Sequence, residues 1–247
     1  MISKNQIKYV HQLELKKFRK QEGLFIAEGH KVVGDLLEAG FTPRQLFATS
    51  DWLATNQMAG AIEVTPDELT RLSLLQHPQQ VLALFPIPET SAISPDSSAL
   101  SLLLDNVQDP GNLGTIIRIA DWFGISTIYC SEGTVDAWNP KVIQATMGSI
   151  ARVQIVYTDP IQLFDSLPTD FPIYGTFLDG ENIYTQSLSQ HGIIVMGNEG
   201  NGISETVRAR VTHKLLIPDF HQGDTADSLN VGVATAITCS EFRRRSL

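Results

Sequence analysis

An apolar run followed by a polar turn and a new helical pattern occurs three times in the second half of the chain. The copies are 102–104 followed by 106–118, 193–196 followed by 197–202, and 215–218 followed, after a loop, by 228–231. Each copy predicts a buried strand that ends in a polar turn. Because open parallel sheets bind ligands beyond the carboxyl ends of their strands, the pattern predicts an α/β protein with its functional groups at one edge of a sheet.

Strands and helices alternate through the whole of this half. We expect strands near 102–105, 127–130, 153–156, 173–178, 193–196 and 214–217, and helices near 113–123, 140–147, 160–167, 204–209 and 229–244. This alternation predicts a mainly parallel sheet that is covered by helices on both faces. Trp122 and Phe123, at the end of the first of these helices, are expected in the core.

The first half of the chain predicts a smaller α/β unit. A helix is expected from the capping Ser3 to Gly23, and another begins at Thr65 with Pro66 at its first position. The remaining expected elements are a helix at 31–39 and strands at 24–27, 45–48, 61–64 and 81–85. The Pro- and Ser-rich stretch 86–98 predicts a linker. We therefore predict one domain over residues 1–95, including linker, and a second over 96–247.

Composition limits the class of protein. The 247 residues are 43% hydrophobic and 18% charged, which allows a sizeable core. No apolar stretch approaches the roughly 20 residues that cross a bilayer, and the polar start lacks a signal core, so we expect no membrane partner and a cytoplasmic protein. Cys130 and Cys239 are far apart and the six histidines are scattered, so no metal site is expected.

The charge distribution leaves two interpretations open. A net charge of -9 argues against a nucleic-acid partner, because phosphate binding needs a basic surface. The first 20 residues nevertheless contain six Lys and Arg against one Glu, and three arginines stand at 243–245. These basic ends are either a solvated helix face and tail or surfaces that contact RNA.

The glycine-rich stretch 197–204 does not match the common phosphate-binding loops. Ile203 stands where a nucleoside-triphosphate loop needs lysine, and the spacing of Gly197, Gly200 and Gly202 departs from the dinucleotide pattern. A triphosphate or NAD site is therefore disfavoured. We expect a flexible backbone loop that approaches a flat ligand closely and presents Glu199.

Five polar side chains stand at or near the predicted strand ends: Asn112, Arg118, Glu199, Ser228 and Asn230. Each alone has a structural explanation. Arg118 fits the exposed side of an amphipathic helix, Glu199 complements the positive end of the next helix, and Ser228 and Asn230 suit helix caps. Their joint occurrence at three strand-end loops favours a functional site.

The blocks 106–118, 197–202 and 217–234 resemble, in order and spacing, the three motifs of the SpoU (TrmH-like) class of SPOUT RNA methyltransferases. The resemblance covers residues of about 100 to 245, and the stretch 23–29 looks like the substrate-binding domain of that class. It implies S-adenosylmethionine-dependent methylation of a ribose 2′-hydroxyl in RNA by a homodimer whose C-terminal region forms a trefoil knot. It also favours ribosomal over transfer RNA.

The resemblance implies a role for each candidate residue. Arg118 is the implied catalytic residue, supported by Asn112, Glu199, Ser228 and Asn230, and the implied main-chain contacts to the cofactor come from Gly197, Ile217 and Leu229. A ribose hydroxyl is a poor nucleophile, so a group must accept or relay its proton as it attacks. Because arginine keeps its charge, Arg118 either relays and orients or stabilises the developing alkoxide.

Two departures from the usual pattern of this class lie near the third motif. The loop 219–227 is more acidic and slightly longer than is usual, and Gly232 stands where a serine is common. Neither removes an implied catalytic group, but both bear on RNA docking and on the fit of the cofactor.

Three rival functions stay open. A transfer-RNA 2′-O-methyltransferase would share every motif. A non-catalytic RNA-binding factor with the same fold is disfavoured by the intact Asn112 and Arg118. An α/β enzyme for a small nucleotide is favoured by the acidic balance, and salt separates it from RNA binders, since RNA binding weakens steeply with added salt.

Overall fold

The computed structural model describes residues 2–89, 95–221 and 227–245, and the chain divides into two compact units. The first unit comprises Met1–Glu89 together with Asp136–Arg152, and the second comprises Thr90–Val135 and Val153–Leu247. Residues 136–152 thus pack with the first unit although they follow its linker in the chain. Part of the expected linker, 90–94, and part of the acidic loop, 222–226, lie outside the described residues.

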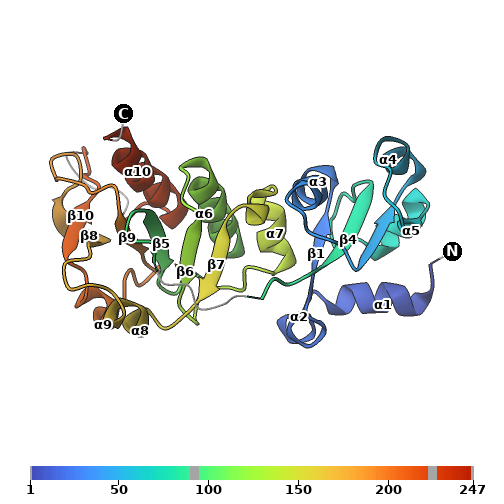
Figure 1. The fold of residues 1–247 in the computed structure, drawn as a ribbon, viewed down its shortest axis with the longest axis horizontal. Coiled ribbons are helices and arrows are strands. Elements are labelled where there is room, and N and C mark those ends of the chain that lie inside the picture. The colour runs from blue at the N-terminus through green and yellow to red at the C-terminus, as the bar shows by residue number, and fades with distance from the viewer. Residues whose placement is uncertain (1, 90–94, 222–226, 246–247) are drawn as a thin grey trace. The chain divides into compact units, whose positions relative to one another are not determined.

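The first unit contains a four-stranded sheet in the order β1-β4-β2-β3 (Figure 1). Strand β4 pairs antiparallel with β1 and β2, and β2 pairs parallel with β3. The elements are β1 (Leu24–Glu28), β2 (Gln45–Ala48), β3 (Ile62–Glu63), β4 (Val81–Pro86), α1 (Lys4–Gln12), α2 (Lys16–Glu22), α3 (His30–Glu38), α4 (Ser50–Thr55) and α5 (Pro66–Leu72). The expected strands, α3 and α5 are confirmed, and the capping box of Thr65 with Glu68 is present.

The expected single helix from Ser3 to Gly23 is wrong, because the chain breaks into α1 and α2. The cause is the guanidinium of Arg19, which is only 2% exposed. It donates to the carbonyl oxygens of Leu13, at 2.9 Å, and Glu14, at 2.6 Å, which lie just after α1. Gly23 adopts a left-handed conformation, with φ of 64°, and ends α2 as expected.

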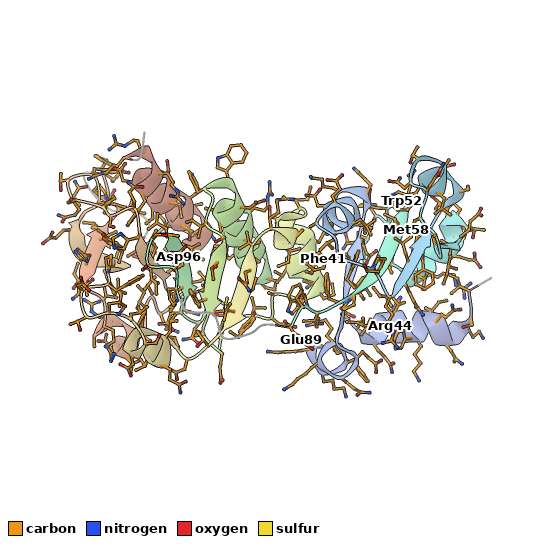
Figure 2. The ribbon with its side chains drawn as sticks, in the orientation of Figure 1. Phe41, Arg44, Trp52, Met58, Glu89 and Asp96 are labelled. Atoms are coloured by element: carbon orange, nitrogen blue, oxygen red, sulfur yellow. The ribbon has the colours of Figure 1, made fainter. Side chains whose placement is uncertain are left out.

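Aromatic rings fill one side of the first unit. Phe25 of β1 stacks on Phe85 of β4 with ring centroids 5.7 Å apart. Phe41, labelled in Figure 2, meets Phe85 edge-on. The ring centroid of Trp138 lies 4.7 Å from that of Phe25, so the segment 136–152 shares this core. This segment carries α7 (Pro140–Thr146) and the short helix η1 (Ser149–Ala151).

The second unit is built on a six-stranded sheet in the order β10-β8-β9-β5-β6-β7, and all its pairings are parallel. The strands are β5 (Leu100–Leu104), β6 (Thr127–Cys130), β7 (Gln154–Tyr157), β8 (Ile173–Asn182), β9 (Gly192–Met196) and β10 (His213–Leu216). Every residue of β5 and β9 is buried, as parallel strands covered on both faces require. The mainly parallel sheet is confirmed.

In the part of this unit that the structure describes, four helices cover the sheet: α6 (Pro110–Trp122), α8 (Pro160–Asp165), α9 (Glu205–Arg208) and α10 (Val231–Arg244). Figure 1 shows α6 and α10 together on one face and α8 and α9 on the other, and both pairs are in contact. On the second face the core joins strand residues such as Leu103 and Val195 to Phe164 and Val207. No helix among the described residues has the length and apolar composition to span a bilayer.

The expectation that Trp122 lies in the core is wrong, since this side chain is 84% exposed. Ile116, Ile117 and Ala120 already supply the buried side of α6. Trp122 follows Arg118 by one helical turn, so both stand on the solvent side of the helix. Packing within this chain does not explain why a tryptophan stands at this exposed position.

A shift of register between β8 and β10 shapes the edge of the sheet. Lys214 pairs with Gly175, but the next residue, Leu215, pairs with Glu181. The segment 176–180 therefore leaves the plane of the sheet. A Cβ at Gly180 would lie 2.5 Å from the backbone carbon of Leu215, so glycine allows the two strands to approach again beyond the excursion.

Candidate functional site

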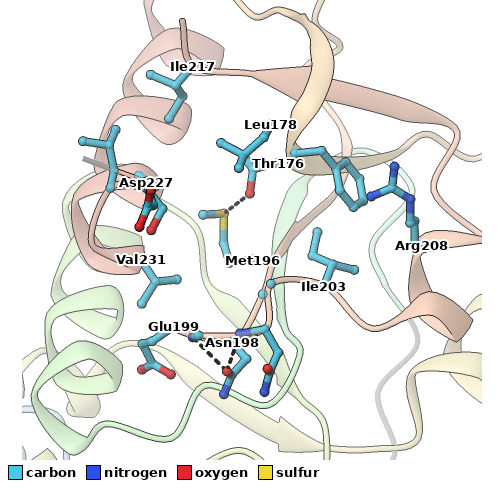
Figure 3. Close-up of a pocket in the computed structure, with 18 of the residues that line it drawn as sticks. Thr176, Leu178, Met196, Asn198, Glu199, Ile203, Arg208, Ile217, Asp227 and Val231 are labelled. Atoms are coloured by element: carbon cyan, nitrogen blue, oxygen red, sulfur yellow. Dashed lines mark hydrogen bonds between the residues drawn. The ribbon is translucent and has the colours of Figure 1, made fainter. Parts of the chain in front are cut away.

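A pocket of about 520 Å³ opens at the carboxyl ends of β9 and β10, beside the middle of β8 (Figure 3). Its walls come from the excursion of β8 at 176–179, the glycine loop at 196–203, the end of β10 at 216–217 and the described part of the loop before α10 at 227–231. All of these segments belong to the second unit. The volume lies within the range of about 300–1,000 Å³ that is typical of small-molecule sites.

The glycine loop is closed by hydrogen bonds of Asn198. The main chains of Asn198 and Gly202 exchange two hydrogen bonds, of 2.9 and 3.0 Å. The side-chain oxygen of Asn198 accepts from the amides of Gly200 and Asn201, and Figure 3 shows both of these bonds. A Cβ at position 197 would lie 2.3 Å from the carbonyl carbon of Gly202, so only glycine fits there.

Glu199 joins the glycine loop to the turn before α6. Its carboxylate accepts from the amides of Gln108, at 3.2 Å, and Asp109, at 3.1 Å, and from the side-chain amide of Asn112, at 3.0 Å. Asn112 in turn accepts a hydrogen bond of 2.8 Å from the side chain of Asn230. Side chains from all three sequence blocks thus form one hydrogen-bonded network.

The network keeps Glu199 ionised. Partial burial acts to raise the pKa of this carboxyl, but the hydrogen bonds from the side chain of Asn112 and from backbone amides outweigh it and lower the pKa. A carboxylate whose pKa is lowered in this way is a weak base, so the geometry suits a clamp that holds two loops together.

Comparison with known proteins identifies the family to which this chain belongs. The model of the SpoU rRNA Methylase family matches residues 99–240, more than half of the chain, and the MRM3-like substrate binding domain matches residues 4–83. The chain belongs to the SpoU rRNA methylase family. The resemblance seen in the sequence is therefore confirmed.

Relatives of this SpoU-family chain extend over its full length. The 23S rRNA (guanosine(2553)-2′-O)-methyltransferase RlmP of Bacillus subtilis is 30% identical over 98% of this chain and 97% of its own. A TrmH-family protein of Porphyromonas gingivalis superimposes with a TM-score of 0.89 and 41% identity, covering 99% of each chain. An AdoMet-bound rRNA methyltransferase of Sinorhizobium meliloti gives 0.87 and 30%, covering 100% of this chain and 97% of that one. These matches confirm the α/β fold.

The residues that the family resemblance assigns to the cofactor all line the pocket of this SpoU methylase. Gly197 follows β9, Ile217 follows β10, and Leu229 precedes α10. Ser228, expected in the catalytic set, lines the same pocket. Asn230 caps α10 by accepting from the amides of Gly232 and Val233, so it acts as the cap that its residue type suggests and as part of the network.

Arg118 lies outside this network in a single chain. It follows Asn112 by six residues on α6, which places it about 9 Å further along the helix axis and on another side of the helix. It is exposed, does not line the pocket, and makes no hydrogen bond or ion pair with any other residue that the structure describes. The structure brings Asn112, Glu199 and Asn230 together and leaves Arg118 apart.

Several residues that shape the site carried no signal of their own in the sequence. Asp105 is buried and accepts from the amide of Ser204 and the side chain of Asn106, both at 2.7 Å, so it anchors both loops. Its position at the end of an apolar run was the one available signal. The opposite wall contains Phe177, which the unforeseen excursion of β8 places there. The guanidinium of Arg208, at the end of α9, lies 4.5 Å from the centroid of its ring.

Proposed function

We propose that this chain transfers a methyl group from S-adenosylmethionine to a ribose 2′-hydroxyl in RNA, with ribosomal RNA as the substrate. The observation that carries the proposal is the network of Glu199, Asn112 and Asn230 beside the pocket. It joins the three blocks that define the family at the edge of one ligand-sized pocket. The name of the Bacillus subtilis relative supports ribosomal RNA and the 2′-oxygen as the target.

The residues present fit S-adenosylmethionine. Met196, Ile203 and Val231 give the pocket apolar walls, as Figure 3 shows. The bare backbone at Gly197 provides a cradle that a Cβ would close. The main chain at Gly197 and Ile217, together with that at Leu229, would hold the cofactor, as the family resemblance implies. When bound, it supplies an electrophilic methyl group on a sulfonium.

The polar residues would position the sugar and manage its proton. Asn112 is held on both sides, by Glu199 and Asn230, so its remaining hydrogen-bonding capacity points in a fixed direction. Arg118 keeps its positive charge and would stabilise the negative charge that develops on the attacking 2′-oxygen, or relay its proton through a phosphate. Because DNA lacks the 2′-hydroxyl, this chemistry selects RNA.

The chain would act as a homodimer. Trp122 is 84% exposed at the end of α6, and Leu229 and Val233 are each 50% exposed at the start of α10. The start of α10 lies beside Thr115 and its end beside Phe123, so these exposed side chains stand at opposite ends of the packed pair α6 and α10. Exposed apolar side chains are typical of a surface that another protein covers. A second copy on this surface would also bring Arg118 towards a pocket from which its own chain separates it.

Three further features follow from the same assignment. The chain runs from β10, at one edge of the sheet, back to α10 against α6, which is consistent with the implied trefoil knot. We place the protein in the cytoplasm, together with its RNA substrate. Residues 1–95 would bind the substrate, as the match of 4–83 to a substrate binding domain supports, and 96–247 would bind the cofactor and transfer the methyl group.

The deciding experiment compares Arg118→Ala with the wild type. We expect S-adenosylmethionine to bind equally well by calorimetry, whereas transfer of labelled methyl groups to unmodified ribosomal RNA falls by about 10²-fold or more. Arg71→Ala, at an exposed position of the first unit, is the control and keeps full activity. Undiminished transfer by Arg118→Ala would refute the assignment of this residue, and transfer to transfer RNA alone would replace the proposed substrate.

A further inference from the structure

Most arginines of the chain are already engaged within it. Arg243 donates to the carbonyl oxygens of Phe123 and Gly124 at the end of α6, and the two arginines that follow it pair with Glu241. Four other arginines form ion pairs within the described residues: Arg19–Asp136, Arg152–Asp35, Arg208–Asp179 and Arg210–Asp165. The basic stretch at 243–245 thus holds its own unit together and is not a free cationic tail.

The lysines of α1 and α2 are arranged differently. Five of them form what we call the α1–α2 lysine face: Lys4, Lys8, Lys16, Lys17 and Lys20. All five are exposed, and none forms an ion pair with another residue in the described part of the chain. They are the main concentration of unpaired positive charge in a protein whose net charge is -9.

Helix geometry gathers these lysines on the outer sides of the two helices. Lys4 and Lys8 are one turn apart on α1 and so share a side. On α2, Lys16, Lys17 and Lys20 fall within an arc of about 100°. The buried Arg19 falls outside this arc, about 60° from Lys16, and it binds the corner between the two helices.

Two further residues bear on the charge of this surface, Glu22 and Arg44. The hydroxyl of Tyr9 donates to Glu22 at 3.0 Å, which engages one of the two acidic residues in this part of the chain. The pKa of Tyr9 is raised by burial, by that hydrogen bond and by the charge of Glu22, while the charge of Arg44 opposes the rise. Arg44, exposed and labelled in Figure 2, therefore lies near α1.

We propose that the α1–α2 lysine face binds phosphates of the RNA backbone and is the main electrostatic docking surface for the substrate. This inference rests on the proposed function and adds which side chains of the first unit hold the RNA and which part of the RNA they contact. A protein that is acidic overall repels RNA at long range, so phosphates must be met by a local group of unpaired cations. Lysine ammonium groups act as point charges, so the contact is independent of base sequence.

The test measures binding of a fluorescein-labelled RNA hairpin by Lys16→Gln/Lys20→Gln over a range of salt concentrations. Each lost phosphate contact makes the plot of log affinity against log salt shallower by about 1, so the double variant is expected to lose about 2 from the slope. In methyl transfer to ribosomal RNA, KM for the RNA rises while kcat is kept. Lys16→Arg/Lys20→Arg keeps the charges and is expected to restore wild-type binding.

The matched control is Lys31→Gln/Arg210→Gln, which removes two charges that already face carboxylates, those of Asp35 and Asp165. It is expected to leave the salt slope unchanged. Equal weakening by the control would show an effect of net charge alone and overturn the inference. An unchanged salt slope in Lys16→Gln/Lys20→Gln would also overturn the inference. If the wild type still transfers methyl groups to RNA, the proposed function then stands. Absence of RNA methylation by the wild type would overturn the proposed function itself.

Discussion

Glu199 shows how one side chain can organise the site without taking part in the chemistry. Its carboxylate accepts two hydrogen bonds from the turn before α6 and one from Asn112 in the first turn of that helix. Glu199→Gln keeps the shape but places an amide opposite donors, so we expect affinity for S-adenosylmethionine to fall by about 1–3 kcal/mol. Calorimetry measures this change. Glu205→Gln, at another exposed carboxylate of the pocket, is the control, and an equal loss there would contradict the role of the clamp.

The same clamp sets the response of the wild type to acid. Because the folded pKa of Glu199 is below its ordinary value of 4.5, the carboxylate stabilises the loop fully above that value. This contribution is lost as the pH falls through the lowered folded pKa. We therefore expect cofactor affinity to show an acid limb in the wild type that is absent in Glu199→Gln, when calorimetric titrations are compared across that range.

Residue patterns in the sequence located the three loops, because polar groups after apolar runs are visible in any parallel α/β chain. They did not show that Asn198 closes the glycine loop or that Asp105 anchors it, since these bonds join residues about 90–100 positions apart or depend on the turn geometry. The position of Arg118 away from Asn112 follows from helix spacing alone. Its role stays a prediction until it is tested in the assembled protein.

Individual helices and strands were predictable where local signals agreed with the fold. The capping box at Thr65 starts α5, and Gly23 ends α2. The break between α1 and α2 was missed because its cause is long-range. The guanidinium of Arg19 contacts the carbonyl groups at the corner and also Asp136, which comes from a distant segment. The excursion of β8 was missed because it arises from pairing with β10.

The corner between α1 and α2 offers a test at the scale of these elements. Arg19→Met leaves Asp136 and two carbonyl groups without their partner, so we expect the first unit to lose about 3–5 kcal/mol of stability. Urea denaturation followed by circular dichroism measures this loss. Lys17→Met, at an exposed neighbour, should change stability by no more than about 0.5 kcal/mol.

Two outcomes for the Arg19 variants separate the interpretations. Arg19→Lys keeps the charge but loses the planar fork that reaches both the carbonyls and Asp136, so an intermediate loss is expected. If Arg19→Met were as stable as Lys17→Met, the buried pair would not be what fixes the corner, and the arrangement of the lysine face would need another cause.

At the scale of the whole molecule, alternation of strands and helices predicted the parallel sheet and its covered faces. It could not predict that 136–152 packs with the first unit, because the segment looks like any other helical crossover between β6 and β7. Nor could it place Trp122 on the surface. The sequence period indicates which side of a helix is apolar. Whether a given residue is exposed depends on which other elements of the fold pack against that part of the helix.

The exposed Trp122 gives the prediction that tests the assembly. If a second copy covers the exposed side of α6 and the start of α10, Trp122→Glu places a charge in that interface. It then weakens dimerisation by about 2 kcal/mol or more, roughly 30-fold in Kd, as measured by analytical ultracentrifugation. Leu15→Glu adds the same charge at an exposed apolar position of the first unit and should leave the association state unchanged.

At concentrations where Trp122→Glu is monomeric, S-adenosylmethionine should still bind to the chain's own pocket, but methyl transfer should be lost because Arg118 no longer reaches a site. Full transfer by the monomer would show that one chain suffices, and Arg118 would then have to reach Asn112 through a rearrangement of α6 itself.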